Sequence, residues 1–383
     1  MNIAAGNETE LLRRLYSENK WSQLMQTAAA IANQPPRNRE ALRYWGIGEL
    51  ALRRGGVDKL LQAALLEDVE APLWLGVLQE FSSYAPERIE FGELLFQVDL
   101  ARLRRSPYLE YPRVVSIETL AVCNAACSFC PYPKMDRQGD RMSDELIDKI
   151  ISDLKQIPGY VPFTIAPFKV NEPFLDKRIF SVCAKINEAL PHADLRLFTN
   201  GSPLTEDILE KVAGIRNVTH LWVSLNEIEA QAYQELMQLP LERTLAKLDM
   251  LHERVDHGNF PHPVVVSRVA DGTERDKAFY TFVQQRYPRF KPFMIGRKNW
   301  TGQVDIPTGP RVPPMGCGRW YELSIMASGK VALCCMDGEG KHVIGDVNLQ
   351  TALEVYNSSS YRKMRQFTFS RRAAAAPCDT CDY

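Results

Sequence analysis

From Tyr111 onward the sequence alternates short β-rich segments with longer amphipathic ones, and this alternation constrains the fold more than any other feature. Strands separated by helices form parallel sheets with the helices outside. The region therefore predicts an α/β fold, either a partial barrel or a doubly wound sheet, with ligands at the carboxyl ends of the strands. The predicted strands are Val114–Thr119, Phe163–Lys169, Leu195–Thr199, Leu221–Leu225, Val264–Val269 and Pro292–Ile295. The predicted helices are Ser143–Leu154, Lys177–Ala189, Thr205–Val212, Leu241–Arg254 and Glu274–Tyr287.

Residues 1–107 contain only helical patterns. Residues 41–52 resemble one half of a tetratricopeptide-type repeat, so we expect an all-helical, tetratricopeptide-like domain. Two interpretations stay open, a stacked-helix domain that docks a partner or peptide and a helical cap that stabilises the rest of the chain. The expected helices are Glu8–Leu15, Trp21–Asn33, Asn38–Arg54, Val57–Glu67 and Ala71–Ser82.

A Gly/Pro-rich linker follows the last predicted strand, and a hairpin pattern follows the linker. The hairpin strands are expected at Trp320–Met326 and Lys330–Cys334, with a turn at Ala327-Ser328-Gly329. A helical stretch is expected from Leu349 to Gln366. We therefore predict three domains: a helical domain at 1–107, the α/β domain at 112–298 and a small extension at 299–383.

The charge of the chain excludes some classes of partner. The formal net charge is −1, which predicts no general affinity for nucleic acid or for an anionic membrane. The sequence has no run of 18 or more apolar residues, and its N-terminus has no basic region followed by an apolar one. We therefore expect a cytoplasmic protein with no membrane partner.

Eight of the nine cysteines fall in two groups, which in a reducing compartment indicates metal binding rather than disulfides. Cys123, Cys127 and Cys130 lie in the loop after the first predicted strand. Three closely spaced thiolates can hold an iron–sulfur cluster and leave one iron open for another ligand. A structural zinc site would need a fourth ligand nearby, and no further cysteine precedes Cys183.

The C-x3-C-x2-C spacing, with Phe129 before the last cysteine, resembles the signature of the radical S-adenosylmethionine (SAM) superfamily. The resemblance implies a partial (β/α)6 barrel with a [4Fe–4S] cluster whose unique iron is chelated by SAM. It also implies reductive cleavage of SAM to a 5′-deoxyadenosyl radical that abstracts a substrate hydrogen, with electrons from a reducing partner such as flavodoxin or ferredoxin.

The resemblance also implies SAM-binding residues at the ends of the strands. Asn171-Glu172-Pro173 stands where the family usually has Gly-Gly-Glu-Pro, so Glu172 must carry more of the contact with the methionyl amino group. A plain strand-exit turn is the alternative for this segment. For Arg268 we weigh the cofactor carboxylate against a salt bridge to a barrel glutamate such as Glu118. The complete expected set is Phe129, Asn171, Glu172, Asn200, Ser224, Asn226, Ser267, Arg268 and Ile295.

The second cysteine group resembles the SPASM/twitch extension of radical SAM enzymes. Its expected ligands are Cys317, Cys334, Cys378 and Cys381, with Gly329 completing a C-x11-G-x4-C pattern. No cysteine follows Cys381, which favours the shorter twitch form with one auxiliary [4Fe–4S] cluster. Cys335 competes with Cys334, but strand alternation directs it to the opposite face. Four thiolates also suit zinc, which is the alternative occupant.

These residues predict a function as well as a fold. Asp337 is a candidate base for substrate oxidation near the auxiliary cluster, and a turn with Gly338 is its alternative role. We expect a radical SAM enzyme that oxidises or modifies a small natural-product or sugar-type substrate, or a peptide. One alternative is a maturase of ribosomally made peptides or of proteins that docks its substrate on the helical domain. A second is a non-catalytic metal-binding structural protein.

Overall fold

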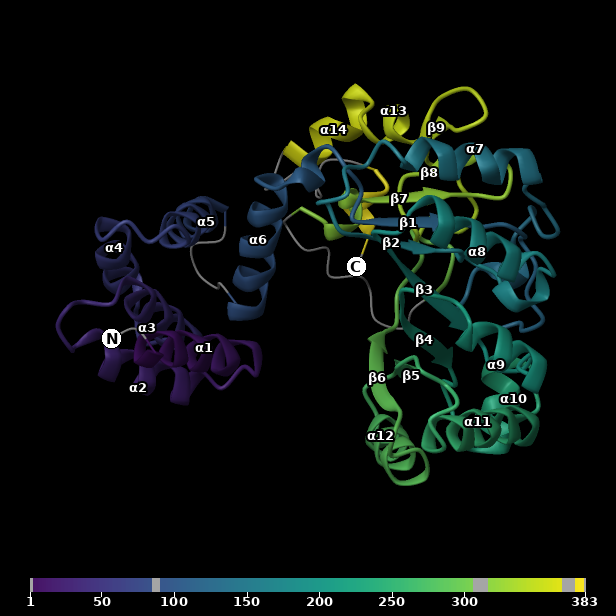
Figure 1. Ribbon diagram of the computed structural model, residues 1–383, viewed down its shortest axis with the longest axis horizontal. Coiled ribbons are helices and arrows are strands. Elements are labelled where there is room, and N and C mark those ends of the chain that lie inside the picture. Colours follow the sequence, from purple (N-terminus) through teal and green to yellow (C-terminus); the bar gives the residue numbers. More distant parts are fainter. Residues whose placement is uncertain (1–2, 85–89, 306–315, 367–375, 382–383) are drawn as a thin grey trace. The chain divides into compact units, whose positions relative to one another are not determined.

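The computed structural model describes residues 3–84, 90–305, 316–366 and 376–381 (Figure 1). It divides into two compact units, one formed mainly by residues 1–105 and a second that begins at Ser106. Each unit is described by itself.

The first unit is helical, as expected from its sequence. Its core contains fully buried side chains from successive helices, among them Leu12, Leu24, Leu60 and Trp74. The last helix of this unit was not delimited by the sequence patterns. The helices are α1 (Ile3–Ser17), α2 (Trp21–Ala32), α3 (Arg39–Ala51), α4 (Val57–Leu65), α5 (Ala71–Tyr84) and α6 (Phe91–Arg104).

Helices α3 and α4 approach closely at a pair of glycines. A Cβ atom added at Gly46 would lie 2.7 Å from the carbonyl oxygen of Gly56. Gly56 also has a φ of +106°, a conformation that side-chain-bearing residues rarely adopt. The two glycines thus let the helices stack tightly, as the predicted tetratricopeptide-like packing requires.

The second unit is built on one sheet with the strand order β6-β5-β4-β3-β2-β1-β7-β8-β9. Strands β1 to β6 are parallel and lie beside one another in chain order, as can be followed in Figure 1. A doubly wound sheet would reverse its order at a switch point, so the order identifies the partial barrel. The barrel strands are β1 (Val114–Ile117), β2 (Phe163–Ala166), β3 (Ala193–Thr199), β4 (Val218–Ser224), β5 (Val264–Ala270) and β6 (Lys291–Gly296).

Helices follow the strands and cover one face of the sheet. The positions of β3 and β4 on that face, such as Leu195 and Leu221, are fully buried. The alternate positions Arg196, Phe198 and Trp222 are only half-buried, so water reaches the concave face. The sequence patterns missed one of these helices, α10. The helices are α7 (Asp144–Leu154), α8 (Ile179–Ala189), α9 (Glu206–Ala213), α10 (Ala230–Met237), α11 (Leu241–Asp256) and α12 (Glu274–Arg286).

The extension continues the barrel sheet. Strand β7 (Glu322–Ile325) pairs parallel with β1, with Leu323 opposite Val115. The predicted hairpin joins β7 to β8 (Lys330–Ala332), and β9 (Val343–Asp346) lies beyond it. Helices α13 (Ala352–Tyr356) and α14 (Ser359–Gln366) occupy the predicted helical stretch. The boundary expected near residue 298 therefore does not separate two compact units.

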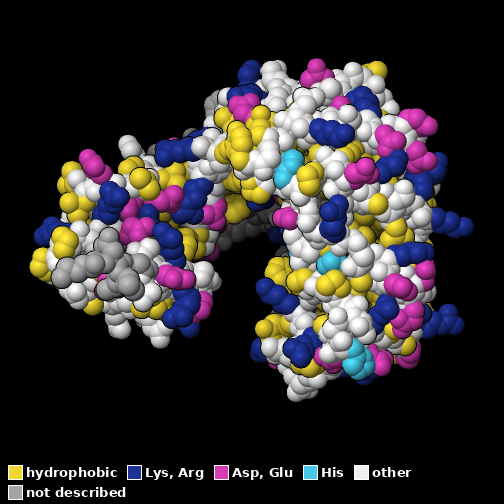
Figure 2. Space-filling view, viewed as in Figure 1, with side chains coloured by type: hydrophobic (Ala, Val, Ile, Leu, Met, Phe, Trp, Pro, Cys, Tyr) yellow, Lys and Arg dark blue, Asp and Glu magenta, His cyan; other side chains and the backbone are white. Residues whose placement is uncertain are grey.

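The surface carries charges of both signs. On the face drawn in Figure 2, Lys and Arg side chains are interspersed with Asp and Glu, in line with the formal charge of −1. Among the helices of the described ranges, none is long and apolar enough to span a bilayer.

The sheet pairing predicts how the chain tolerates truncation. Deleting residues 1–105 should leave a folded protein, because the helical unit has its own core. Deleting residues 299–383 should prevent folding, because β1 loses β7 and becomes an unprotected edge strand. Far-UV circular dichroism and size-exclusion chromatography measure both outcomes. A monomeric 1–298 fragment that unfolds cooperatively would contradict the prediction.

Candidate functional site

The first three cysteines lie together in the cysteine loop, residues 118–142 between β1 and α7. Their side chains are half-buried, and burial raises the pKa of Cys123 to about 11 and that of Cys130 to about 12. Burial, together with negative charge on Cys130 and Cys123, raises the pKa of Cys127 well above its usual value. A metal centre bound at these thiols would hold them as thiolates. This arrangement fits a cluster bound by three cysteines.

Helix α10 holds the cysteine loop in place. The backbone N–H of Ala126 donates to the Met237 carbonyl over 3.2 Å, and that of Ser128 donates to the Leu236 carbonyl over 3.0 Å. The Met237 sulfur also lies 3.4 Å from the Cys127 sulfur. Sequence reasoning missed this contribution because the helix itself was not predicted.

Glu172 is a buried carboxylate beside the cysteine loop. Its oxygens accept hydrogen bonds from the backbone N–H of Asn200 over 2.6 Å and of Phe174 over 3.2 Å. Burial raises its pKa to about 7, and within the described part of the chain no Lys, Arg or His pairs with it. A bound cation would restore the charged form, so the site fits an ammonium group.

Asn200 joins this carboxylate to the cysteine loop. Its side-chain amide donates to the Asn124 side chain over 2.8 Å and lies 3.9 Å from the Cys123 sulfur. Asn171 lies one residue before Glu172, and its side-chain nitrogen is buried with no hydrogen-bond partner among the described residues. The structure thus places two of the expected SAM-binding residues, Glu172 and Asn200, next to Cys123.

Four other expected residues lie at the carboxyl ends of β4, β5 and β6. Ser224 pairs in register with Ser267, whose backbone carbonyl accepts from the N–H of Asn226. The Asn226 side-chain amide contacts the Met237 sulfur at 3.2 Å, which links this group to α10. Ile295 pairs with Val269 at the sheet edge.

A cleft of about 260 Å³ opens beside these strand ends. The expected residues Phe129 and Arg268 both line it. Other lining residues are Ser128, Glu227, Leu236, Val269, Asp271, Arg275 and Arg297.

Arg268 is already bound by groups of the protein. Its guanidinium donates to Asp276 and Asp271, each over 2.7 Å, and to Glu227 over 3.1 Å. The Asn226 carbonyl accepts a further hydrogen bond from it. The alternative partner Glu118 pairs with Arg137 instead.

Arg297 is the lining residue that sequence reasoning missed. It directly follows β6, and its Nε is buried without an acceptor within the described residues. The sequence signal was a basic residue at the end of the last barrel strand, next to the Met294-Ile295-Gly296 segment.

The four cysteines expected in the second group line one small cavity. Cys317 comes from the segment before β7, Cys334 from the end of the hairpin, and Cys378 and Cys381 from the tail. Apolar side chains, including Trp320, Leu333 and Met336, complete the lining.

Cys335 is absent from this lining and lies near Arg319, Glu322 and Lys169. The geometry thus favours Cys334 over Cys335. Among the described residues, no three His, Cys, Asp or Glu side chains are close enough for a single ion. A cubane is larger than an ion and separates its thiolates further, so the cavity fits a cluster better than zinc.

Asp337 lies next to this cavity and is fully buried. Its carboxylate accepts from the backbone N–H groups of Gly340 and Lys341, each over 3.0 Å, and of His342 over 2.7 Å. Three N–H donors occupy lone pairs of the carboxylate oxygens. The geometry favours the turn role over the base role.

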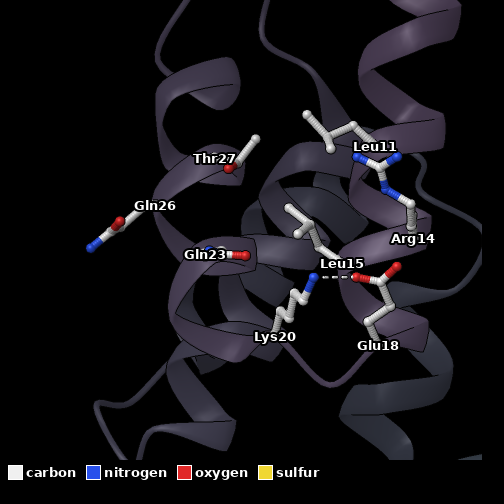
Figure 3. Close-up of a pocket in the computed structure, with 8 residues that line it drawn as sticks. All are labelled: Leu11, Arg14, Leu15, Glu18, Lys20, Gln23, Gln26 and Thr27. Carbon is white, nitrogen blue, oxygen red and sulfur yellow. Dashed lines mark ion pairs between the residues drawn. The ribbon is translucent and has the colours of Figure 1, made fainter.

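The helical unit has a separate groove between α1 and α2. Figure 3 shows the eight side chains that line it, with an ion pair of 2.6 Å between Lys20 and Glu18. Its lining is mostly polar and exposed, and it contains no cysteine or histidine. We assign no chemistry to this groove.

Comparisons with known proteins identify two domains in this chain. The family model of the radical SAM superfamily matches residues 117–268, and that of SPASM, an iron–sulfur cluster-binding domain, matches residues 317–382. A comparison with curated proteins found no similar sequence.

Two solved structures share the fold. SuiB of Streptococcus suis bound to precursor peptide SuiA has a TM-score of 0.56 at 14% identity, covering 94% of this chain and 86% of that chain. BtrN in complex with AdoMet and 2-DOIA has a TM-score of 0.50 at 16% identity, covering 71% of this chain and 93% of that chain. The chain belongs to the radical SAM superfamily, whose cofactors are SAM and a [4Fe–4S] cluster, and it carries a C-terminal SPASM domain for auxiliary iron–sulfur binding.

Proposed function

We propose that the chain is a radical SAM enzyme that oxidises or otherwise modifies an organic substrate after hydrogen abstraction. The observation that carries this proposal is the triplet of half-buried thiols beside a buried carboxylate, Glu172, and a cleft lined by Arg297, whose Nε has no partner within the described residues. When bound, the cluster and SAM supply a 5′-deoxyadenosyl radical. Residues of this chain must bind and orient the cofactor and the substrate.

These residues complement the charges of SAM. Glu172 would accept the methionyl ammonium group, because its buried carboxylate has hydrogen-bond donors but, among the described residues, no cation. Arg297 would bind the methionyl carboxylate, because Arg268 is already bound by three carboxylates. Phe129 would close the cleft beside the adenosyl group. The remaining expected residues Asn171, Asn200, Ser224, Asn226, Ser267 and Ile295 would line the rest of the cofactor site.

The second cysteine group would hold one auxiliary [4Fe–4S] cluster, which gives two clusters per chain. Four thiols line its cavity, and four thiolates complete the coordination of a cubane. A role of Asp337 as a base is the less favoured proposal, because its carboxylate already accepts hydrogen bonds from the backbone of the turn that follows it.

Two classes of substrate are candidates for this enzyme. A small natural-product or sugar-type substrate is one candidate. A peptide is the second, and the compact helical unit supports it because stacked helices commonly dock extended partners. SuiB, which shares the fold, was solved with its precursor peptide. We place the activity in the cytoplasm, where a flavodoxin or ferredoxin would supply the electrons.

The central test is SAM cleavage. Anaerobically reconstituted protein given dithionite and SAM should form 5′-deoxyadenosine, measured by liquid chromatography with mass detection. Cys127→Ala should abolish the product, because two thiolates do not hold the cluster. Cys183→Ala is the matched control, since this buried thiol lies on α8 outside both groups. If wild-type protein loaded with iron forms no 5′-deoxyadenosine, the proposed function is wrong.

The auxiliary ligand set gives a second prediction. Wild-type protein should bind about eight irons, and Cys334→Ala should retain about four, because the auxiliary cubane loses a ligand. Cys335→Ala should retain about eight, since this thiol does not line the cavity. Iron analysis and electron paramagnetic resonance measure both variants. The reverse pattern would assign the ligand to Cys335.

The role of Arg297 gives a third prediction. Arg297→Gln should raise the Kd for SAM about 10- to 100-fold, because a hydrogen bond to a charged group contributes about 1.5–3 kcal/mol. Arg289→Gln is the matched control, since Arg289 is exposed and pairs with Asp256. Isothermal titration of the reconstituted proteins measures both. Equal affinities for the two variants would exclude Arg297 from the SAM site.

A further inference from the structure

The concave face of the barrel carries two basic side chains on neighbouring strands. Arg196 of β3 and His220 of β4 are paired in register. Both are half-buried, whereas Leu195 and Leu221 on the opposite face are fully buried. The two basic side chains therefore lie inside the barrel, where water and small molecules reach them.

These groups lack hydrogen-bond acceptors. The Nε of Arg196 and the Nε2 of His220 are buried and have no partner within the described residues. The other ring nitrogen of His220 lies 3.2 Å from the Thr219 hydroxyl. Buried polar groups normally have partners, so two unpartnered nitrogens on adjacent strands indicate a missing acceptor.

The charge around Arg196 is positive. Its guanidinium interacts electrostatically with Arg113, Arg319 and Glu322. Glu322 is already bound by Arg113 over 3.0 Å and by Arg319 over 2.9 Å. Asp194, which also attracts Arg196, is exposed on β3. Burial and the charges of Arg196 and Lys291 lower the pKa of His220 to about 4. An anion next to Arg196 and His220 would offset the excess positive charge.

A row of aromatic side chains lies next to Arg196 and His220, the pair that we call the basic level of the barrel. Phe168 stacks on Phe198 at 4.5 Å between ring centroids, and Phe198 lies 5.7 Å from Trp222. Trp222 meets Phe293 edge-on at 5.0 Å. The Trp222 indole donates to the Ser267 hydroxyl over 2.7 Å, and Ser267 belongs to the expected SAM site. The row thus lies between the basic level and the cofactor.

We propose that the barrel interior binds a substrate carboxylate at Arg196 and His220, with the apolar body of the substrate against the row of Phe168, Phe198, Trp222 and Phe293. This assignment rests on the proposed function, since it names the substrate class of that same site. Guanidinium and imidazole N–H groups match carboxylate oxygens, and the row matches an apolar or aromatic body nearest to the cofactor. The carboxylate belongs either to a small organic acid or to a peptide.

Titration calorimetry on the reconstituted full chain tests the proposal. The small-acid probe is 3-phenylpropionate, and 3-phenylpropanol is its neutral control. The peptide probe is acetyl-Gly-Phe with a free carboxylate, and the C-terminal amide of the same peptide is its neutral control. At least one acid should bind, and its neutral analogue should bind about 10- to 100-fold more weakly. Binding of 3-phenylpropionate, with or without binding of the peptide acid, indicates a small-acid site. Binding of the peptide acid alone indicates a peptide substrate.

Variants locate the binding site. Arg196→Gln should weaken binding of the acid about 10- to 100-fold, and Arg196→Lys should weaken it less, because the charge remains. Arg254→Gln is the matched control, since Arg254 lies on α11 and pairs with Glu206. Circular dichroism and iron content verify folding. If Arg196→Gln does not fold, the comparison of acid with neutral analogue on the wild type decides.

Three results would overturn the proposal. They are binding of neither acid, equal binding of acid and neutral analogue, or unchanged affinity in folded Arg196→Gln. Calorimetry does not depend on turnover. Absence of 5′-deoxyadenosine would therefore count against the proposed function, and absence of acid binding against this inference alone.

Discussion

The carboxylate of Glu118 joins the segments on which both cysteine groups depend. It is fully buried at the end of β1 and forms an ion pair with Arg137 of the cysteine loop. It also accepts from the backbone N–H groups of Val170, after β2, and Ala327, in the β7–β8 turn, each over 3.3 Å. A buried charge is stable only when it is paired and hydrogen-bonded, so these segments must meet at this carboxylate. Removing it would leave Arg137 buried without its partner.

Lys169 extends this network to the auxiliary site. Its ammonium group is buried and donates to the Asp337 carbonyl over 2.7 Å, with the Cys335 carbonyl at 3.5 Å. Burial lowers its pKa, and the charge of Glu118 opposes that effect. The turn that follows Cys334 is thus anchored to the barrel by a buried cation. The strand before the cysteine loop, β1, and the strand before Cys334, β8, belong to one continuous sheet.

The proposed substrate chamber lies within the same framework. Arg319 lines the auxiliary cavity and pairs with Glu322, which interacts with Arg196 across the barrel interior. The auxiliary site, the basic level and the aromatic row therefore belong to adjoining parts of one unit.

The sequence by itself determined the local features of this protein. The six strands, the hairpin and the composition of both cysteine groups depend on neighbouring residues, since side-chain periodicity and ligand spacing act within a few residues. The expected SAM-binding residues Glu172 and Asn200 could be named because they end predicted strands. Helix α10 was not predicted from the sequence, although its residue Met237 contacts Cys127.

Only the tertiary structure decided which groups are paired and which are free. The pairing of β7 with β1 joins segments about two hundred residues apart, and no local pattern specifies it. Arg268 and Arg297 are both arginines near strand ends, yet one is bound by three carboxylates and the other has an Nε without a partner within the described residues. The surroundings of Arg196 likewise depend on distant segments, since Arg113, Arg319 and Glu322 all interact with it. Burial and partner choice are properties of the assembled sheet, because desolvation and charge pairing act through space and not along the chain.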